Sequence, residues 1–333
     1  MSICDWARHK DLRSDANANT VLTAFDLNES LTIIPSFAGS CQVRSMKALI
    51  VINKLARQGQ AEFDDALAQL RAGGIEFQVS VIDRIAKIPG LVRDLGRAFD
   101  LVILGGGDGT FNAGVEAVMQ IERPLGILPL GTANDLARSL GISLSMAEAA
   151  RTIVEGHTRR IDLGWVNGKH YFNVASLGLT AGLRPLLTRA RKRRWGVLAY
   201  PISLVSVYRT SRPFRAHIIC GGKVKSTASI QIAVGNGRHY GGGLVVHEDS
   251  SIDDHLLNLY CIQPQPFRNL IRMLPAIKDG TFYDQEGVWV MDGTEFRILT
   301  SRPKRISADG EIVARTPAHF KVKSAALPVF APL

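Results

Sequence analysis

The chain has 333 residues, 46% of them hydrophobic, and a formal net charge of +10, which fits a soluble globular protein of two domains and excludes a low-complexity chain. Its four cysteines form no Cys-x-x-Cys pair, so we expect reduced thiols and a cytoplasmic protein. No apolar run reaches the ~18 residues of a membrane span, and no apolar core follows the charged N-terminus, so we expect neither a spanning helix nor a signal peptide.

The first half of the chain alternates like a parallel α/β domain, which we expect at residues 46–158 after a loosely ordered extension, 1–45. Apolar runs predict strands at 47–52, 75–82, 101–104 and 125–130. Helices are expected between the strands: one ends at Gly73-Gly74, others lie near 89–98 and after the third strand, one begins at Asn134, and the last starts with a capping box of Ser145 and Glu148. This rhythm predicts a doubly wound, Rossmann-like domain.

After about residue 158 the pattern changes to short alternating segments. Asn167-Gly168 and Gly221-Gly222 predict hairpin turns. Further strands are expected at 228–234, 256–262, 287–291, 294–300, 305–309 and 319–324, with helical stretches near 183–209 and 266–279. We therefore expect an antiparallel β-sandwich domain at 159–313, with the C-terminal tail, about 314–333, packing back on the first domain.

The positive charge is concentrated in one segment. Residues 163–247 contain thirteen Lys and Arg and no Asp or Glu, whereas the rest of the chain has 27 basic and 30 acidic residues. Such a field fits an anionic membrane surface or a nucleic acid, or it is a solvated face without a partner. Within it, 189–215 joins basic residues, a Trp and an apolar stretch, which suits anionic lipid headgroups or a core helix with a basic rim. No nucleic-acid module signature accompanies it.

The stretch LVILGGGDGTFN, 101–112, places glycines and an acid directly after a buried strand. Glycines can adopt positive φ and let main-chain N–H groups surround a phosphate at the positive end of the next helix. Asp108 would repel a bare phosphate, so a cation between them is required, which favours Mg²⁺ with a nucleoside triphosphate. The loop is neither a Walker A loop nor a GxGxxG fingerprint. The alternative is a tight turn with a helix-capping Asp.

A second loop, LPLGTANDLARSLGI (128–142), repeats the order of strand, Gly-Thr turn and helix. Thr132 could hydrogen-bond a phosphate or a sugar, and Asn134 or Asp135 could cap the helix, or the loop serves capping alone. Two such loops at the carboxyl ends of strands in one sheet would line one crevice.

These two motifs, with IDLGWVNGKHYFNVASLG, VGNGRHYGGG and SADGE in the same order, resemble the diacylglycerol kinase catalytic-domain family, in particular bacterial YegS-type lipid kinases. The likeness runs from about residue 46 to 333. It implies a two-domain fold, an ATP site in the interdomain cleft, Mg²⁺, and phosphorylation of a lipid hydroxyl.

The resemblance also implies roles for individual residues. Nucleotide contacts fall on Asn53, Gly106, Gly107, Asp108, Gly109, Thr110, Phe111, Asn112 and Thr132. Glu311 matches the proton acceptor, and a carboxylate can take the proton of a lipid alcohol as the γ-phosphoryl group transfers, while Asp108 works with Mg²⁺. Without the resemblance, Asp309-Gly310 is a hairpin turn beside an exposed Glu.

A structural magnesium loop is implied at 250–259, with Ser251 and Leu256 binding through carbonyls and Asp254 through its carboxylate. The chain departs from the family pattern at four positions: His255 replaces Gly, His247 replaces Pro, Ile82 replaces a nucleotide-contacting Thr, and Ala113 stands where Glu is frequent. The first two concern metal occupancy, and the last two concern ATP binding.

The expected function is an ATP- and Mg²⁺-dependent lipid kinase, cytoplasmic and peripherally membrane-associated, that binds no nucleic acid. The acceptor is diacylglycerol-like, phosphatidylglycerol-like or a sphingoid base. Two alternatives stay open: an NAD kinase with a similar GGDGT loop, and a catalytically inactive lipid- or nucleotide-binding regulator, which the departures at Ile82, Ala113 and His255 would fit.

Overall fold

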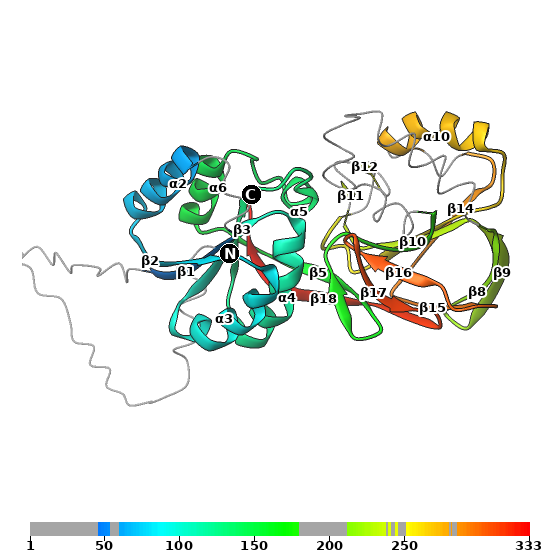
Figure 1. Cartoon of the computed structure of the whole chain (residues 1–333), viewed down its shortest axis with the longest axis horizontal. Coiled ribbons are helices and arrows are strands. Elements are labelled where there is room, and N and C mark those ends of the chain that lie inside the picture. The colour runs from blue at the N-terminus through cyan, green and yellow to red at the C-terminus, as the bar shows by residue number, and fades with distance from the viewer. Residues whose placement is uncertain are drawn as a thin grey trace, which may run out of the picture.

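The computed structural model describes residues 46–53, 60–179, 212–237, 239–240, 244–245, 251–279, 281 and 285–333. Two lobes lie side by side, and two long strands, β5 (Thr158–Val166) and β18 (Ala318–Phe330), run between them (Figure 1). The predicted extension 1–45, the predicted helix near 183–209 and His247 lie outside the described residues.

The first lobe is a parallel sheet with strand order β2-β1-β3-β4, and β18 continues it beyond β4. Its strands are β1 (Met46–Asn53), β2 (Ile75–Ile82), β3 (Leu101–Gly106) and β4 (Leu125–Pro129). Every residue of β3 and β4 is buried, as their unbroken apolar runs require for strands covered on both faces.

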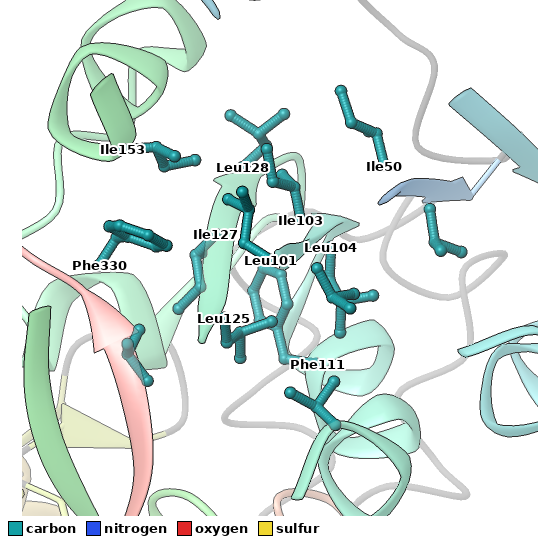
Figure 2. Packing of buried hydrophobic residues seen from close by; sticks show 14 of the residues in the cluster. Ile50, Leu101, Ile103, Leu104, Phe111, Leu125, Ile127, Leu128, Ile153 and Phe330 are labelled. Atoms are coloured by element: carbon teal, nitrogen blue, oxygen red, sulfur yellow. The ribbon is translucent and has the colours of Figure 1, made fainter. Parts of the chain in front are cut away.

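Helices cover both faces of this sheet. They are α2 (Gln60–Ala72), α3 (Ile88–Leu95), α4 (Asp108–Ile121), α5 (Asp135–Ser139) and α6 (Met146–Glu155), with short 3-10 turns η2 (Ile85–Lys87) and η3 (Gly96–Ala98) flanking α3. Ile103 packs toward Ile153 of α6, and the next residue, Leu104, packs toward Gly114 of α4, so the two helices lie on opposite faces. The core that results is drawn in Figure 2, where Phe111 of α4 and Phe330 of β18 flank the strand residues.

The second lobe is a β-sandwich. One layer is antiparallel, with order β14-β13-β10-β7-β16-β17; the other extends the first lobe's sheet through β18 to β15, β8 and β9. The strands are β6 (Lys169–Tyr171), β7 (Val174–Gly178), β8 (Phe214–Cys220), β9 (Lys223–Ser229), β10 (Gln231–Gly235), β11 (His239–Tyr240), β12 (Leu244–Val245), β13 (Leu257–Ile262), β14 (Val288–Gly293), β15 (Glu295–Thr300), β16 (Arg305–Ala308) and β17 (Glu311–Arg315). Phe296, Ile298 and Phe320 from one layer belong to the same core as Leu177, Ile232 and Leu259 from the other.

The last helix, α10 (Phe267–Asp279), lies above the antiparallel layer (Figure 1). Leu270 and Met273 join Ala233 and Tyr260 in a small separate core. The predicted combination of an α/β lobe and an antiparallel β-sandwich is confirmed. In the described part of the chain, no helix is long and apolar enough to cross a membrane.

Several local predictions were wrong, among them the strand at 228–234, which is divided between β9 and β10. The last strand runs from 318 to 330 and not from 319 to 324, because its alternation is broken by a bulge between Lys323 and Leu327. β17 was not predicted at all, because the turn residues before it conceal its start. Helix α6 begins at the predicted place, but Glu148 accepts a hydrogen bond from Ser143 and not from Ser145.

Candidate functional site

The glycine loop joins the buried strand β3 to helix α4. Gly107 is the N-cap of α4, with φ −103°, and positive φ occurs at none of the loop glycines, so the predicted conformational role is wrong. The loop needs glycine for close approach instead. A Cβ on Gly131 of the second loop would lie 2.6 Å from the Cα of Gly107, and one on Gly107 would lie 3.0 Å from the Cα of Gly131. The two loops therefore cross backbone to backbone, which explains glycine in both motifs.

Asp108 holds the two loops together. Its Oδ1 accepts a hydrogen bond from the Leu136 N–H at 3.1 Å, so it caps helix α5 of the second loop rather than its own helix. Asn134 stands at the N-cap position of α5 with φ 51° and makes no capping bond. Its side chain turns back to Gly131, accepting from the N–H at 2.9 Å and donating to the carbonyl at 3.0 Å. The predicted cap by Asn134 is thus replaced by Asp108.

The other predicted nucleotide contacts lie at the same edge of the sheet. Asn53 ends β1, one residue beyond the Ile52–Gly105 pair, and Thr132 is exposed in the second loop. Thr110 packs its hydroxyl over Gly106. Asn112 Oδ1 is buried, and no hydrogen-bond partner is found for it among the described residues.

Phe111 is the exception among these residues. Its side chain is fully buried in the core between the sheet and α4 (Figure 2). Only its backbone is therefore available to a ligand.

Two positions that depart from the family pattern lie near these residues. Ile82 is buried at the end of β2, where it pairs with Asn53, and Ala113 packs partly buried against the core.

Glu311 reaches the glycine loop from the second lobe. It begins β17 after the turn of Asp309 and Gly310, whose φ values of 42° and 82° give the left-handed pair of a tight hairpin. Glu311 Oε1 lies 4.0 Å from the position of a Cβ on Gly109, in the first turn of α4. The structure therefore brings the predicted base and the glycine loop together from opposite ends of the chain.

Asp309 fixes that turn in place, and sequence reasoning missed it. Its carboxylate accepts N–H groups of Phe172, Asn173 and Val174 at 2.7, 3.1 and 3.0 Å, and its own N–H donates to the Val174 carbonyl at 2.9 Å. Burial raises the pKa of Asp309 to about 6; the three N–H groups oppose that rise, and the charge of Asp108 adds to it. In the sequence, Asp309-Gly310 predicted only a turn, because no pattern of neighbouring residues shows which N–H groups the Asp309 carboxylate will bind.

A second contact ties α4 to the β-lobe. Both the backbone N–H and Nδ1 of His170 lie within hydrogen-bond distance of Glu116 Oε1, at 3.1 and 2.8 Å. The bond to the His170 ring holds the pKa of Glu116 below its usual range. The helix that begins at the glycine loop is therefore fixed to the hairpin of β5 and β6.

The carboxylates beside the two loops suit Mg²⁺ only as a companion of a nucleotide. In the described part of the chain, no three His, Cys, Asp or Glu side chains gather at a metal position. Mg²⁺ commonly uses one or two carboxylates together with substrate phosphates and water, and Asp108 can supply such a carboxylate. This donor set fits a metal that arrives with a phosphate chain.

The predicted magnesium loop is less suited to a cation. Asp254 accepts the N–H groups of Ser251 and Leu256 at 3.0 and 2.9 Å, so its carboxylate closes the loop by itself. Ser251 and Leu256, whose backbone carbonyls were predicted to bind the ion, both lie in this turn. The ligand set Ser251, Asp254 and Leu256 stays a prediction, and the contacts present do not fit an ion bound to Asp254.

Two protein-family models match the chain: a diacylglycerol kinase catalytic domain over residues 47–166, and a YegS C-terminal NAD kinase beta sandwich-like domain over 173–331. A diacylglycerol kinase of Bacillus subtilis (strain 168) is 30% identical over 227 residues, which are 67% of this chain and 75% of that protein. A probable lipid kinase YegS of Escherichia fergusonii is 30% identical over 290 residues, 84% of this chain and 94% of the relative.

A solved structure, a putative diacylglycerol kinase from Bacillus anthracis str. Sterne, has the same fold. It superimposes with a TM-score of 0.75 at 23% identity and covers 89% of this chain and 98% of its own.

Proposed function

The chain belongs to the diacylglycerol kinase catalytic-domain family of lipid kinases, and we propose that it transfers the γ-phosphoryl group of ATP to a lipid hydroxyl, with Glu311 as proton acceptor. The observation that carries this proposal is the position of Glu311 Oε1, 4.0 Å from the Cβ position of Gly109 at the start of α4. A helix N-terminus attracts phosphate through its free N–H groups and its dipole, so the carboxylate stands beside the place where a phosphate chain would bind.

Bonds would form and break at the γ-phosphorus in a single transfer step. The lipid hydroxyl oxygen forms a bond to the γ-phosphorus, the bond between that phosphorus and the β–γ bridging oxygen breaks, and the hydroxyl proton passes to Glu311. ADP leaves with the electron pair of the broken bond. Mg²⁺ bound with the nucleotide would neutralise charge on the phosphates, and Asp108 is the carboxylate that would hold this ion.

The protein contributes mainly fixed positions to this step. Asp309 clamps the hairpin that carries Glu311, and the bond from Leu136 to Asp108 fixes the second loop against the first. Positioning of this kind accounts for much of the catalysis of phosphoryl transfer, because the chemistry requires little covalent help.

The acceptor proposed is a diacylglycerol-like, phosphatidylglycerol-like or sphingoid lipid that approaches from the β-lobe. The names of the relatives, diacylglycerol kinase and probable lipid kinase, support a lipid acceptor. We also propose peripheral binding to anionic membranes. Five basic residues of the acid-free segment are described and all are exposed: Lys169, Arg212, Arg215, Lys223 and Lys225. The remainder of the basic stretch, 189–211, lies outside the described residues.

The test is phosphorylation of a total lipid extract with radiolabelled ATP and Mg²⁺, with mass spectrometry of the labelled product. We expect labelled lipid from the wild type, roughly 100-fold less from Glu311→Gln, since a general base contributes about 10²–10⁴ in rate. The matched control is Glu122→Gln, an exposed carboxylate at the opposite end of α4, which keeps the wild-type rate.

Two results would replace this proposal. Labelling of NAD in place of lipid would favour an NAD kinase, which the name of the second family model keeps in view. Binding of ATP without a labelled product in any extract would favour a regulator. Wild-type turnover in Glu311→Gln would remove the assigned base.

A further inference from the structure

The loop from Ser251 to Leu256 docks on β5, where its carboxylates have protein partners. Asp254 accepts the N–H groups of Ser251 and Leu256. Asp253 forms a two-pronged ion pair with Arg159, whose guanidinium also donates to Ser251 Oγ at 2.9 Å. Arg159 therefore places a fixed cation against the acidic loop, and the pair holds the pKa of Asp253 below its usual range.

Asp162 of β5 carries the third carboxylate at this place. It is 1% exposed and lies opposite the bulge of β18. Its Oδ1 accepts the Ala325 N–H at 2.7 Å and the His255 Nδ1–H at 2.9 Å, and its Oδ2 accepts the His255 backbone N–H at 2.6 Å. Both oxygens of this buried carboxylate are thus occupied by protein donors.

His255 has an unusual conformation for its residue type. Its φ of 63° lies in the left-handed region that favours glycine, and glycine is the residue that the family resemblance implies here. The contact between the imidazole and Asp162 offsets this cost, since a hydrogen bond to a charged group is stronger than a neutral one. The residue that departs from the family pattern therefore adds one side-chain donor to a buried carboxylate that also accepts two backbone N–H groups.

We propose that loop 251–256 is closed without a divalent cation, because Arg159 neutralises Asp253 and the Asp254 carboxylate, which a cation would use, accepts N–H groups from both ends of the loop. Mg²⁺ demands nearly octahedral coordination by oxygen atoms at about 2.1 Å. Here each oxygen of the Asp254 carboxylate already accepts an N–H group of its own loop, so the loop is closed by protein donors in the place of an ion. This inference does not depend on the proposed kinase activity.

The first test measures metal content and thermal unfolding of the full chain without nucleotide. After dialysis against EDTA, the wild type is expected to retain no stoichiometric divalent cation, and its unfolding midpoint is expected to be the same in EDTA and in MgCl2. A midpoint that falls in EDTA and recovers in MgCl2, with Asp254→Asn abolishing the response, would overturn the proposal.

The second test isolates the imidazole. His255→Gly removes the imidazole ring and also removes the conformational strain of a non-glycine residue at positive φ. Glu122 has φ 54° at an exposed helix end, so Glu122→Gly removes the same kind of strain without removing such a ring. We expect the midpoint of His255→Gly to lie about 1–2 °C below that of Glu122→Gly, because loss of one hydrogen bond costs about 1 kcal/mol and a chain of 333 residues shifts less than a small domain. Equal midpoints would show that the ring contributes nothing and would overturn its assigned role.

Discussion

Asp309→Asn tests how the turn that carries Glu311 is held. The substitution keeps the size of the side chain and removes its charge. In the folded protein, Oδ1 accepts from Asn173 and Val174, and Oδ2 accepts from Phe172 at 2.7 Å. An asparagine has one oxygen, so at least one of these N–H groups faces an NH2 group and loses its acceptor, which costs about 1–3 kcal/mol in free energy of unfolding.

The lost charge acts in the opposite direction, and its effect depends on pH. Folding raises the pKa of Asp309 from 3.8 to about 6, mainly through burial. Between these values the folded protein keeps a proton that the unfolded chain has lost, so this carboxyl lowers stability as pH rises through the window. The penalty is about 1 kcal/mol at pH 4.5 and about 3 kcal/mol at pH 7.5, by 1.36 kcal/mol per pKa unit.

The two effects nearly cancel at neutral pH and separate in acid. We expect Asp309→Asn to have a free energy of unfolding close to that of the wild type at pH 7.5. At pH 4.5 it should lose about 2 kcal/mol more relative to the wild type. Urea unfolding at both pH values measures this difference, with the exposed Asp94→Asn as control. A difference that is the same at both pH values would refute the buried, raised-pKa carboxyl.

The crossing of the two loops gives a second prediction. Gly131→Ala places a Cβ 2.6 Å from the Gly107 Cα, and we expect a roughly 100-fold loss of lipid phosphorylation, because a displacement of about 1 Å has such effects. Gly90→Ala in α3, whose Cβ would meet nothing within 4 Å, keeps the wild-type rate, and equal rates in both variants would contradict the argument. Binding to vesicles with anionic lipid should weaken in high salt and on neutralisation of Arg191–Arg194, because salt screens exposed charges. Co-sedimentation that is indifferent to both changes would leave the basic segment without its proposed partner.

The sequence alone determined much of the fold, because the periodicity of apolar residues is a local property. Unbroken apolar runs at 101–104 and 125–130 specified strands buried on both faces, and alternation after residue 158 specified the sandwich. The motifs around Asp108 and Asp309-Gly310 also identified the family, which the comparisons confirm.

Only the tertiary structure decided which donors and acceptors form hydrogen bonds with each other and which backbones come into contact. The glycine loop appeared to need positive φ, but it needs bare backbone against Gly131, a neighbour that no local pattern reveals. Asp108 caps a helix 28 residues away, and Asp309 binds N–H groups at a separation of 135–137 residues. The register of apolar residues fixes where a chain turns and which face it buries. The partner of a buried carboxylate depends on the packing of strands that meet only after folding, and for that reason the chemistry of this site becomes visible in three dimensions alone.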